Sequence, residues 1–227
     1  MTSVSCNLLT SDRSQTASIQ EHIDSVVDDL LASLPRIDRL SSSERRGIIA
    51  RYTAVLEGNF IYWMTGAYLS VSSDLARSII LDNLREEVRD CHPGMLRKFA
   101  TAAHAVPKDT DALAVSRSLL NVRLFIGRLS PVPIVVMMAF FEGFIQRFMA
   151  YLAELAQWQG SVEQEYTAVH GVCDVAHTQE LFRALEAEIS LAHDSREPVE
   201  NFFEGVEFLQ TLIHDVVADP DFSRLRK

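Results

Sequence analysis

The sequence predicts an all-α fold, a bundle of roughly seven or eight helices, on three observations. Apolar residues recur at helical spacings along most of the chain, no run alternates as a strand does, and neither a glycine-rich phosphate loop nor an internal repeat occurs. With 227 residues, 48% of them apolar and 23% charged, the chain can form one globular core. We expect residues 1–17 to form a flexible N-terminal leader and residues 18–227 a single helical domain.

Helix boundaries follow from capping residues and prolines. Ser41 and Glu44 have the spacing of a capping box, and Pro93 suits a first helical turn, so a helix is expected to restart at His92. Pro131 and Pro133 separate two further helices. The expected helices run over residues 19–34, 41–69, 74–88, 92–104, 109–129 and 131–158, then through a segment ending near 193, and finally from 197 onward.

Charge and cysteine content limit the partners and the compartment. A net charge of −10 argues against nucleic acid or an anionic membrane surface as the main partner. Three widely spaced cysteines, Cys6, Cys91 and Cys173, form no C-x-x-C motif and indicate a reducing compartment. The first residues lack the pattern of a signal peptide. A cytoplasmic protein is therefore expected.

The most apolar stretch predicts a buried core helix rather than a membrane span. It covers residues 131–155 and is interrupted by Glu142, Gln146 and Arg147. Its uninterrupted part, residues 131–141, is too short to cross a bilayer.

The strongest chemical signal is H-x-x-x-D-x-x-H, formed by His170, Asp174 and His177. Offsets of four and seven residues bring these side chains onto one face of a helix. Two imidazoles and a carboxylate suit iron, zinc or manganese. An exposed polar stripe is the alternative, so this triplet needs support from elsewhere in the chain.

Two glutamates in apolar surroundings give that support. Glu142 follows the apolar run 137–141, where an ionised carboxylate is costly unless it is paired or binds a cation. A partly exposed edge, or a pair with Arg147, is the alternative. Glu57 is predicted on one helical face with Phe60 and Met64, and a lone polar position on a mixed helix is an equally valid interpretation there.

A third group lies at Glu86, Glu87 and His92. Adjacent glutamates near a helix end commonly form a solvated face, and periodicity does not separate the two acids here. Together, however, four predicted helices each contribute a carboxylate, a histidine or both, as in bundles that hold two metal ions. Oxygen-rich ligation with three histidines suits iron or manganese better than structural zinc.

This order of acids and histidines resembles the heme-oxygenase-like diiron oxidases and oxygenases over roughly residues 45–215. The resemblance implies a heme-oxygenase-like helical bundle, two Fe²⁺ ions, and O2 as co-substrate. It implies Glu142 as the bridging, catalytically essential carboxylate and His92 and His170 as ligands of one iron. Asp174 and His177, with Glu87 preferred over Glu86, would hold the other iron, and Glu57 matches an additional carboxylate of some members.

The resemblance also implies an O2-dependent oxidation of C–H, C–N or C–C bonds in a specialised biosynthetic pathway. An amino acid or derivative, bulky or aromatic, is the favoured substrate, with oxidative decarboxylation of a fatty acid as the alternative. Side chains near the predicted ligands are expected to bind that small molecule: Phe60, Met64, Met138, Phe141 and Arg123. A structural salt bridge is an alternative role for Arg123.

An external electron donor and a homodimer fit this interpretation. Two other classes stay open, a thiaminase-like helical hydrolase and a metal-free interaction module. The hydrolase needs an activated nucleophile, for which Cys91 and Cys173 lack a recognisable motif. Bound metal would separate both from the oxidase.

Overall fold

The computed structural model describes residues 4–195 and 201–218, and the side chains within them except those of residues 4–13, 173, 174 and 193–195. The described residues form α-helices and one short 3₁₀ turn (Ile37–Arg39), with no strand among them, so the all-α prediction is confirmed. The helices are α1 (Val4–Ser33), α2 (Ser42–Leu56), α3 (Asn59–Ser70), α4 (Asp74–Arg89), α5 (His92–Ala102), α6 (Asp109–Ile126), α7 (Pro131–Trp158), α8 (Glu165–Ser195) and α9 (Glu204–Val217).

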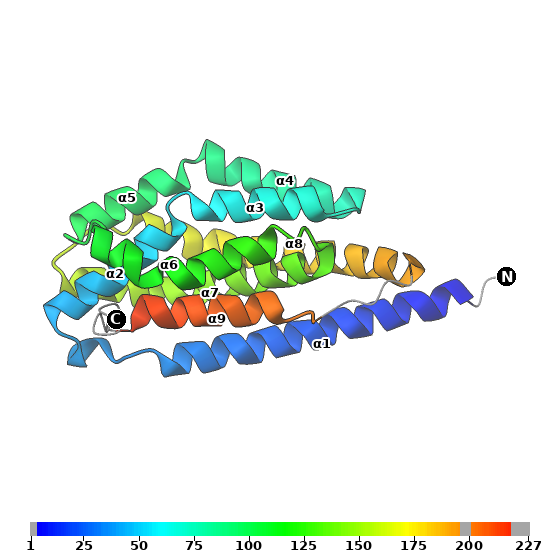
Figure 1. The fold of residues 1–227 in the computed structure, drawn as a ribbon, viewed down its shortest axis with the longest axis horizontal. Coiled ribbons are helices and arrows are strands. Elements are labelled where there is room, and N and C mark those ends of the chain that lie inside the picture. Colours follow the sequence, from blue (N-terminus) through cyan, green and yellow to red (C-terminus); the bar gives the residue numbers. More distant parts are fainter. Residues whose placement is uncertain (1–3, 196–200, 219–227) are drawn as a thin grey trace.

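The helices pack as an elongated bundle around α7 (Figure 1). In this view α1 runs along the lower edge, α3, α4 and α5 lie along the upper edge, and the other helices lie between them. The most extensive helix–helix contact joins α7 to α8, and α8 also packs on α4. The core is therefore built outward from α7, and α8 connects it to the upper layer.

α7 is the central core helix that its sequence predicts. Every residue from Val132 to Glu142 is buried, and Pro133 occupies the first turn, where a missing N–H costs nothing. By length and composition α7 could cross a membrane, yet 83% of its most apolar window is buried inside the protein. Its apolar surface is thus covered by the other helices.

The helix predicted over residues 41–69 is instead two helices, which is a correction. Ser41 caps α2 with the predicted capping box to Glu44, but α2 ends at Leu56 and α3 begins at Asn59. Gly58 between them has φ +88°, a left-handed conformation that glycine adopts without steric cost. The break removes Glu57 from the helical face that it was predicted to share with Phe60.

Two other boundaries differ from the prediction. α1 begins at Val4, inside the segment predicted as a leader, and neither glycine nor proline interrupts the chain before Pro35. The last helix begins at Glu204 rather than near residue 197, and residues 196–200 lie outside the described ranges. The remaining helices agree with the prediction to within a few residues.

Replacing Gly58 by alanine is expected to lower the free energy of unfolding by about 1–2 kcal/mol, because a Cβ disfavours the left-handed conformation. No atom lies within 4 Å of the added Cβ, so the loss reflects the backbone alone. Urea unfolding measures it. Gly58→Asn is the control and should lose less, since asparagine tolerates this conformation. Equal or greater stability of Gly58→Ala would contradict the role given to this glycine.

Candidate metal centre

His170 presents one ring nitrogen to the interior of the bundle. It lies on α8 and is 5% exposed. Its Nδ1 lies 2.8 Å from the carbonyl oxygen of Tyr166, one turn earlier, and a carbonyl can only accept, so Nδ1 carries the proton. The ring of Tyr166 packs on the imidazole with centroids 4.2 Å apart. Nε2 is therefore the unprotonated nitrogen, the form in which histidine binds metals.

His92 and Glu87 meet across the corner between α4 and α5. Cys91 turns the chain there with φ +56°, and Pro93 follows in the first turn of α5. The predicted restart at His92 is thus confirmed, with the break itself at Cys91. His92 Nδ1 donates to Glu87 Oε1 over 2.7 Å, and both side chains are buried. This carboxylate–imidazole pair fixes the orientation of the ring.

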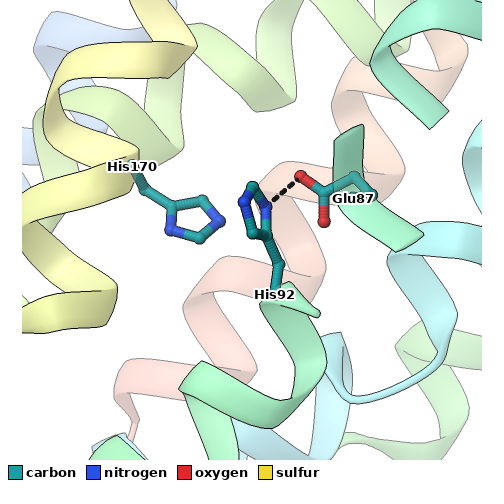
Figure 2. A group of neighbouring side chains, drawn as sticks. All are labelled: Glu87, His92 and His170. Carbon is teal, nitrogen blue, oxygen red and sulfur yellow. Dashed lines mark hydrogen bonds and ion pairs between the residues drawn. The ribbon is translucent and has the colours of Figure 1, made fainter. Parts of the chain in front are cut away.

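The three side chains form one buried cluster. A ligand atom from each of Glu87, His92 and His170 lies within 4.8 Å of the other two. Figure 2 shows the His92 ring between Glu87 and the His170 ring, and the ring centroids of the two histidines are 4.5 Å apart. Only small adjustments would bring these atoms around one ion, because metal–ligand bonds to nitrogen and oxygen are about 2.1 Å long.

Glu142 of α7 lines the same small cavity as these three residues. It is 2% exposed, which confirms that its carboxylate lies in the core rather than at a solvated edge. About 20 Å³ of the cavity is open to the centre of a water-sized sphere, enough for one water molecule or ion. The other walls are mainly apolar: Leu56, Phe60, Ile61, Pro93, Leu96, Ile145 and Tyr166.

Burial and neighbouring charge act differently on the two histidines. Burial lowers the pKa of His170 to about 4, and the nearby His92 adds to this, so His170 is neutral at pH 7. Burial also lowers the pKa of His92, but the hydrogen bond and charge of Glu87 outweigh it and the pKa ends above its ordinary value. A metal ion would therefore find His170 ready to bind and would compete with protons at His92.

A second acid–histidine pair lies nearby on α4 and α8. His177 is 5% exposed and its Nε2 lies 3.0 Å from Glu86 Oε2, while the Glu86 side chain is 44% exposed. Glu87 therefore lies with His92 and His170, and Glu86 lies with His177. That Glu87 and His177 hold the same iron stays a prediction. Because consecutive residues on a helix point about 100° apart, the two glutamates reach different histidines. The side chain of Asp174 lies outside the described residues.

A family model described as an iron-containing redox enzyme matches residues 49–208, more than two thirds of the chain. The chain belongs to this family of iron-containing redox enzymes. The predicted heme-oxygenase-like fold and family are thereby confirmed. Neither the curated proteins nor the solved structures provide a significant match. Family membership favours an oxidoreductase over a thiaminase-like hydrolase or a metal-free interaction module.

The cluster of this iron-family protein fits the metal that the family implies. Imidazole nitrogens and carboxylate oxygens are suitable iron ligands, and Glu87, His92 and His170 are all buried where they come together. His170 is already held by a backbone carbonyl and His92 by a carboxylate, the supports that metal-binding histidines usually have. Glu87, His92 and His170 are thus able to hold an iron ion, with Glu142 beside them.

Glu57 lies outside the cluster. Its carboxylate accepts hydrogen bonds from Arg97 of α5, and its side chain is 31% exposed. It is also absent from the walls of the cavity that Glu142 lines. The break between α2 and α3 at Gly58 accounts for this. Glu57 caps the end of α2 and so does not share a helical face with Phe60.

The predicted substrate residues are divided among several locations. Phe60 lines the metal cavity, and Phe141 lines an apolar cavity beside it. Met64 and Met138 are fully buried in the core and line neither cavity. Arg123 donates two hydrogen bonds to the Asn59 side chain (2.9 and 2.6 Å) and packs over a tyrosine ring. An anchoring role for Arg123 towards substrate therefore has no support here.

Two tyrosines that support the centre were not among the residues predicted from the sequence. Tyr166 holds His170, and its hydroxyl is 2.9 Å from that of Tyr52 on α2. The four-residue spacing from Tyr166 to His170 was available in the sequence, because a histidine can bond the carbonyl one turn earlier. The contact between Tyr166 and Tyr52, which are 114 positions apart, had no such signal.

The metal-free protein should lose stability as pH falls from about 7 towards 4.5, by up to about 3 kcal/mol from His170 alone. The pKa of His170 is about 4 in the folded chain against an ordinary value of 6.5 in the unfolded chain, so between these pH values the unfolded chain binds the proton and the folded chain does not. Urea unfolding at a series of pH values measures this loss.

His170→Phe should remove that part of the pH dependence and keep a ring against Tyr166. Tyr166→Phe is the matched control, because it retains the imidazole and the backbone carbonyl that holds it. If His170→Phe and the wild type lost stability in parallel, the imidazole would not be buried in its neutral form.

Proposed function

We propose that this member of the iron-containing redox family is a non-heme diiron oxidoreductase that uses O2. The observation that carries the proposal is the buried cluster of Glu87, His92 and His170 with Glu142 on the same cavity. Two acids and two imidazoles thus share one water-sized space in the bundle core, where such groups are costly to bury. Carboxylate oxygens and imidazole nitrogens grouped in this way suit iron.

The proposal divides the ligands between two irons. Glu87, His92 and His170 would hold the first. His177 would hold the second, together with Asp174, which the sequence motif supplies, and with Glu86, whose carboxylate already contacts His177. Glu142 would serve both irons. This division replaces the one implied by the resemblance, in which Glu87 belonged with His177.

When bound, the two irons would supply the electrons that reduce O2 and the oxidising power that attacks the substrate. The chain orients the ligands and excludes water. Tyr166 keeps the proton of His170 on Nδ1, so its Nε2 is free for a metal. Glu87 and His92 would exchange the proton that they share for the metal. Leu56, Phe60 and Ile145 form apolar walls that protect reactive species from solvent.

The substrate is proposed to be an amino acid or derivative with an aromatic or otherwise apolar side chain, in a specialised biosynthetic pathway of the cytoplasm. Support comes from the resemblance and from the apolar walls of the cavity, notably Phe60. Oxidative decarboxylation of a fatty acid is the second candidate, since the same walls suit an alkyl chain. Because the cavity holds only a water-sized group, either substrate requires side chains at its rim, such as Ile61, to move.

An external electron donor belongs to the proposal. Full reduction of O2 to water takes more electrons than the oxidation of one C–H or C–N bond supplies, so a donor must provide the remainder. We also propose a homodimer.

Anaerobic titration of the metal-free protein with Fe(II) should saturate near two irons per chain. Glu87→Ala should remove the first iron and His177→Ala the second, each leaving about one per chain, because each variant lacks a ligand of one ion only. Glu57→Ala is the matched control and should keep both irons, since its carboxylate pairs with Arg97. Iron content by mass spectrometry of the desalted protein measures the stoichiometry.

A wild-type stoichiometry of one or none, with a folded protein, would contradict the diiron centre. Loss of an iron in Glu57→Ala would restore the ligand role that the sequence suggested for Glu57. The same titration of Glu86→Gln and of Glu87→Gln tests which of these two acids binds which iron.

The Fe(II)-loaded protein should consume O2 faster with the correct substrate class. O2 uptake and product mass are measured with a panel of amino acids and a panel of medium-chain fatty acids. Turnover of the first panel supports the proposal, and turnover of the second alone replaces it with decarboxylation. Glu142→Ala should abolish turnover in either case, because the bridging carboxylate is lost.

A further inference from the structure

A second cavity lies between α2, α7 and α9, beside the metal cavity. Its walls include Val55 of α2, Phe144 and Phe148 of α7, and Leu212 and Val216 of α9. About 20 Å³ is open to the centre of a water-sized sphere, so it holds one small molecule. An alkyl chain or an amino acid does not fit such a space.

The cavity suits an apolar occupant rather than water. Among its lining side chains Tyr52 alone carries a polar atom, and that hydroxyl is hydrogen-bonded to Tyr166. A buried water molecule needs at least two polar partners, and apolar cavities without them stay dry and bind apolar gases such as xenon. A small apolar gas molecule therefore matches both the size and the chemistry of this space.

Several contacts join the apolar cavity to the metal cavity. Leu56 lines both of them. Phe141, which lines the apolar cavity, packs on Phe60 of the metal cavity with ring centroids 5.8 Å apart. The hydrogen bond between Tyr52 and Tyr166 also crosses from one set of walls to the other. One side-chain layer thus separates a dry cavity from the Glu87–His92–His170 cluster.

The outer wall of the cavity is held in place by a buried arginine. Arg51 of α2 is 3% exposed, and its guanidinium donates to the carbonyls of Val216 (2.8 Å) and Ala218 (2.7 Å) at the end of α9. Hydrogen bonds from a charged donor to the last carbonyls stabilise a helix end. The space between α2 and α9 is therefore fixed by this contact and kept open.

We propose that the cavity between α2, α7 and α9 binds O2 and supplies it to the metal centre past Leu56. The delivery step rests on the proposed function, whereas the binding of a small apolar gas depends on the cavity alone. A reservoir of this kind raises the local concentration of an apolar gas next to a centre from which water is excluded.

Xenon is the probe for the cavity, used on the metal-free full-length protein. Crystals under xenon pressure, or ¹²⁹Xe NMR in solution, should reveal one xenon atom among Val55, Phe148 and Val216. Val216→Phe fills the space and should abolish binding there. Val206→Phe is the matched control, because Val206 is also buried on α9 but lines neither cavity. Should Val216→Phe fail to fold, Val216→Leu adds less volume and should still reduce xenon occupancy.

Delivery is measured without a substrate, as the rate at which O2 oxidises the Fe(II)-loaded protein in stopped flow. Val216→Phe should slow this oxidation several-fold, and Val206→Phe should leave it unchanged. Oxidation by ferricyanide, which needs no gas cavity, should proceed at the same rate in all three proteins. Equal slowing with ferricyanide would mean that the substitution disturbs the irons, and it would overturn the delivery role.

Failure of this inference and failure of the proposed function give different results. Absence of xenon from the cavity, with normal oxidation by O2, overturns the gas site and leaves the diiron proposal intact. If the wild type binds xenon but O2 oxidises the Fe(II)-loaded Val216→Phe variant at the wild-type rate, the cavity does not deliver O2. A wild-type Fe(II) protein that O2 does not oxidise contradicts the proposed function and delivery together, while the xenon result still decides whether the cavity binds gas.

Discussion

The structure depends on a buried ion-pairing contact, the 2.7 Å hydrogen bond between Glu87 and His92, placed against His170 inside an apolar bundle. Each of these groups is costly to bury alone, and each has a partner: Glu87 has His92, and His170 has the carbonyl of Tyr166. The chain must therefore bring the end of α4, the start of α5 and the first turns of α8 together. An iron ion, which the family implies, would satisfy the same groups.

The alignment of α8 against α4 determines where His170 meets Glu87 and His92. The two helices run antiparallel, with Glu86 of α4 at His177 of α8. Further along α8, the buried carboxylate of Glu188 accepts the backbone N–H groups of Ser72 (3.0 Å) and Ser73 (2.7 Å) at the start of α4. A carboxylate at a helix N-terminus is stabilised by the unpaired N–H groups and the helix dipole. Contacts near both ends of α4 thus hold α8 in one alignment.

The central helix supplies the other side of the site. The first part of α7 is buried on both faces up to Glu142, whose side chain lines the cavity of the cluster directly. The aromatic rings of Phe60 and Phe141 pack there, and they separate the polar cavity from the apolar one. Close packing of these rings keeps the polar cluster and the apolar cavity apart although only one side-chain layer lies between them.

Much of this protein could be predicted from its sequence. Helical periodicity and prolines fixed the fold class, the helix from Pro131 to Trp158 and the restart at His92, because these depend on local spacing and backbone chemistry. The same local rules singled out Glu142 as an acid in apolar surroundings and His170 as part of a stripe able to bind a metal. They could not separate Glu86 from Glu87, because the partner of Glu86, His177, is 91 positions away and the partner of Glu87, His92, lies beyond the turn at Cys91.

Tertiary structure decided the partners. The left-handed conformation of Gly58 ends α2, so that Glu57 contacts Arg97. Hydrophobic periodicity in the sequence does not reveal a single residue of this kind. The packing of α8 on α4 places Glu86 against His177, and the turn at Cys91 places Glu87 against His92. The pairing of Tyr52 with Tyr166 likewise exists only in the packed bundle. The sequence by itself determined which side chains are chemically able to bind a metal. The tertiary structure determined which of them meet, because most of those contacts join residues far apart along the chain and the contact of Glu87 with His92 depends on the turn at Cys91.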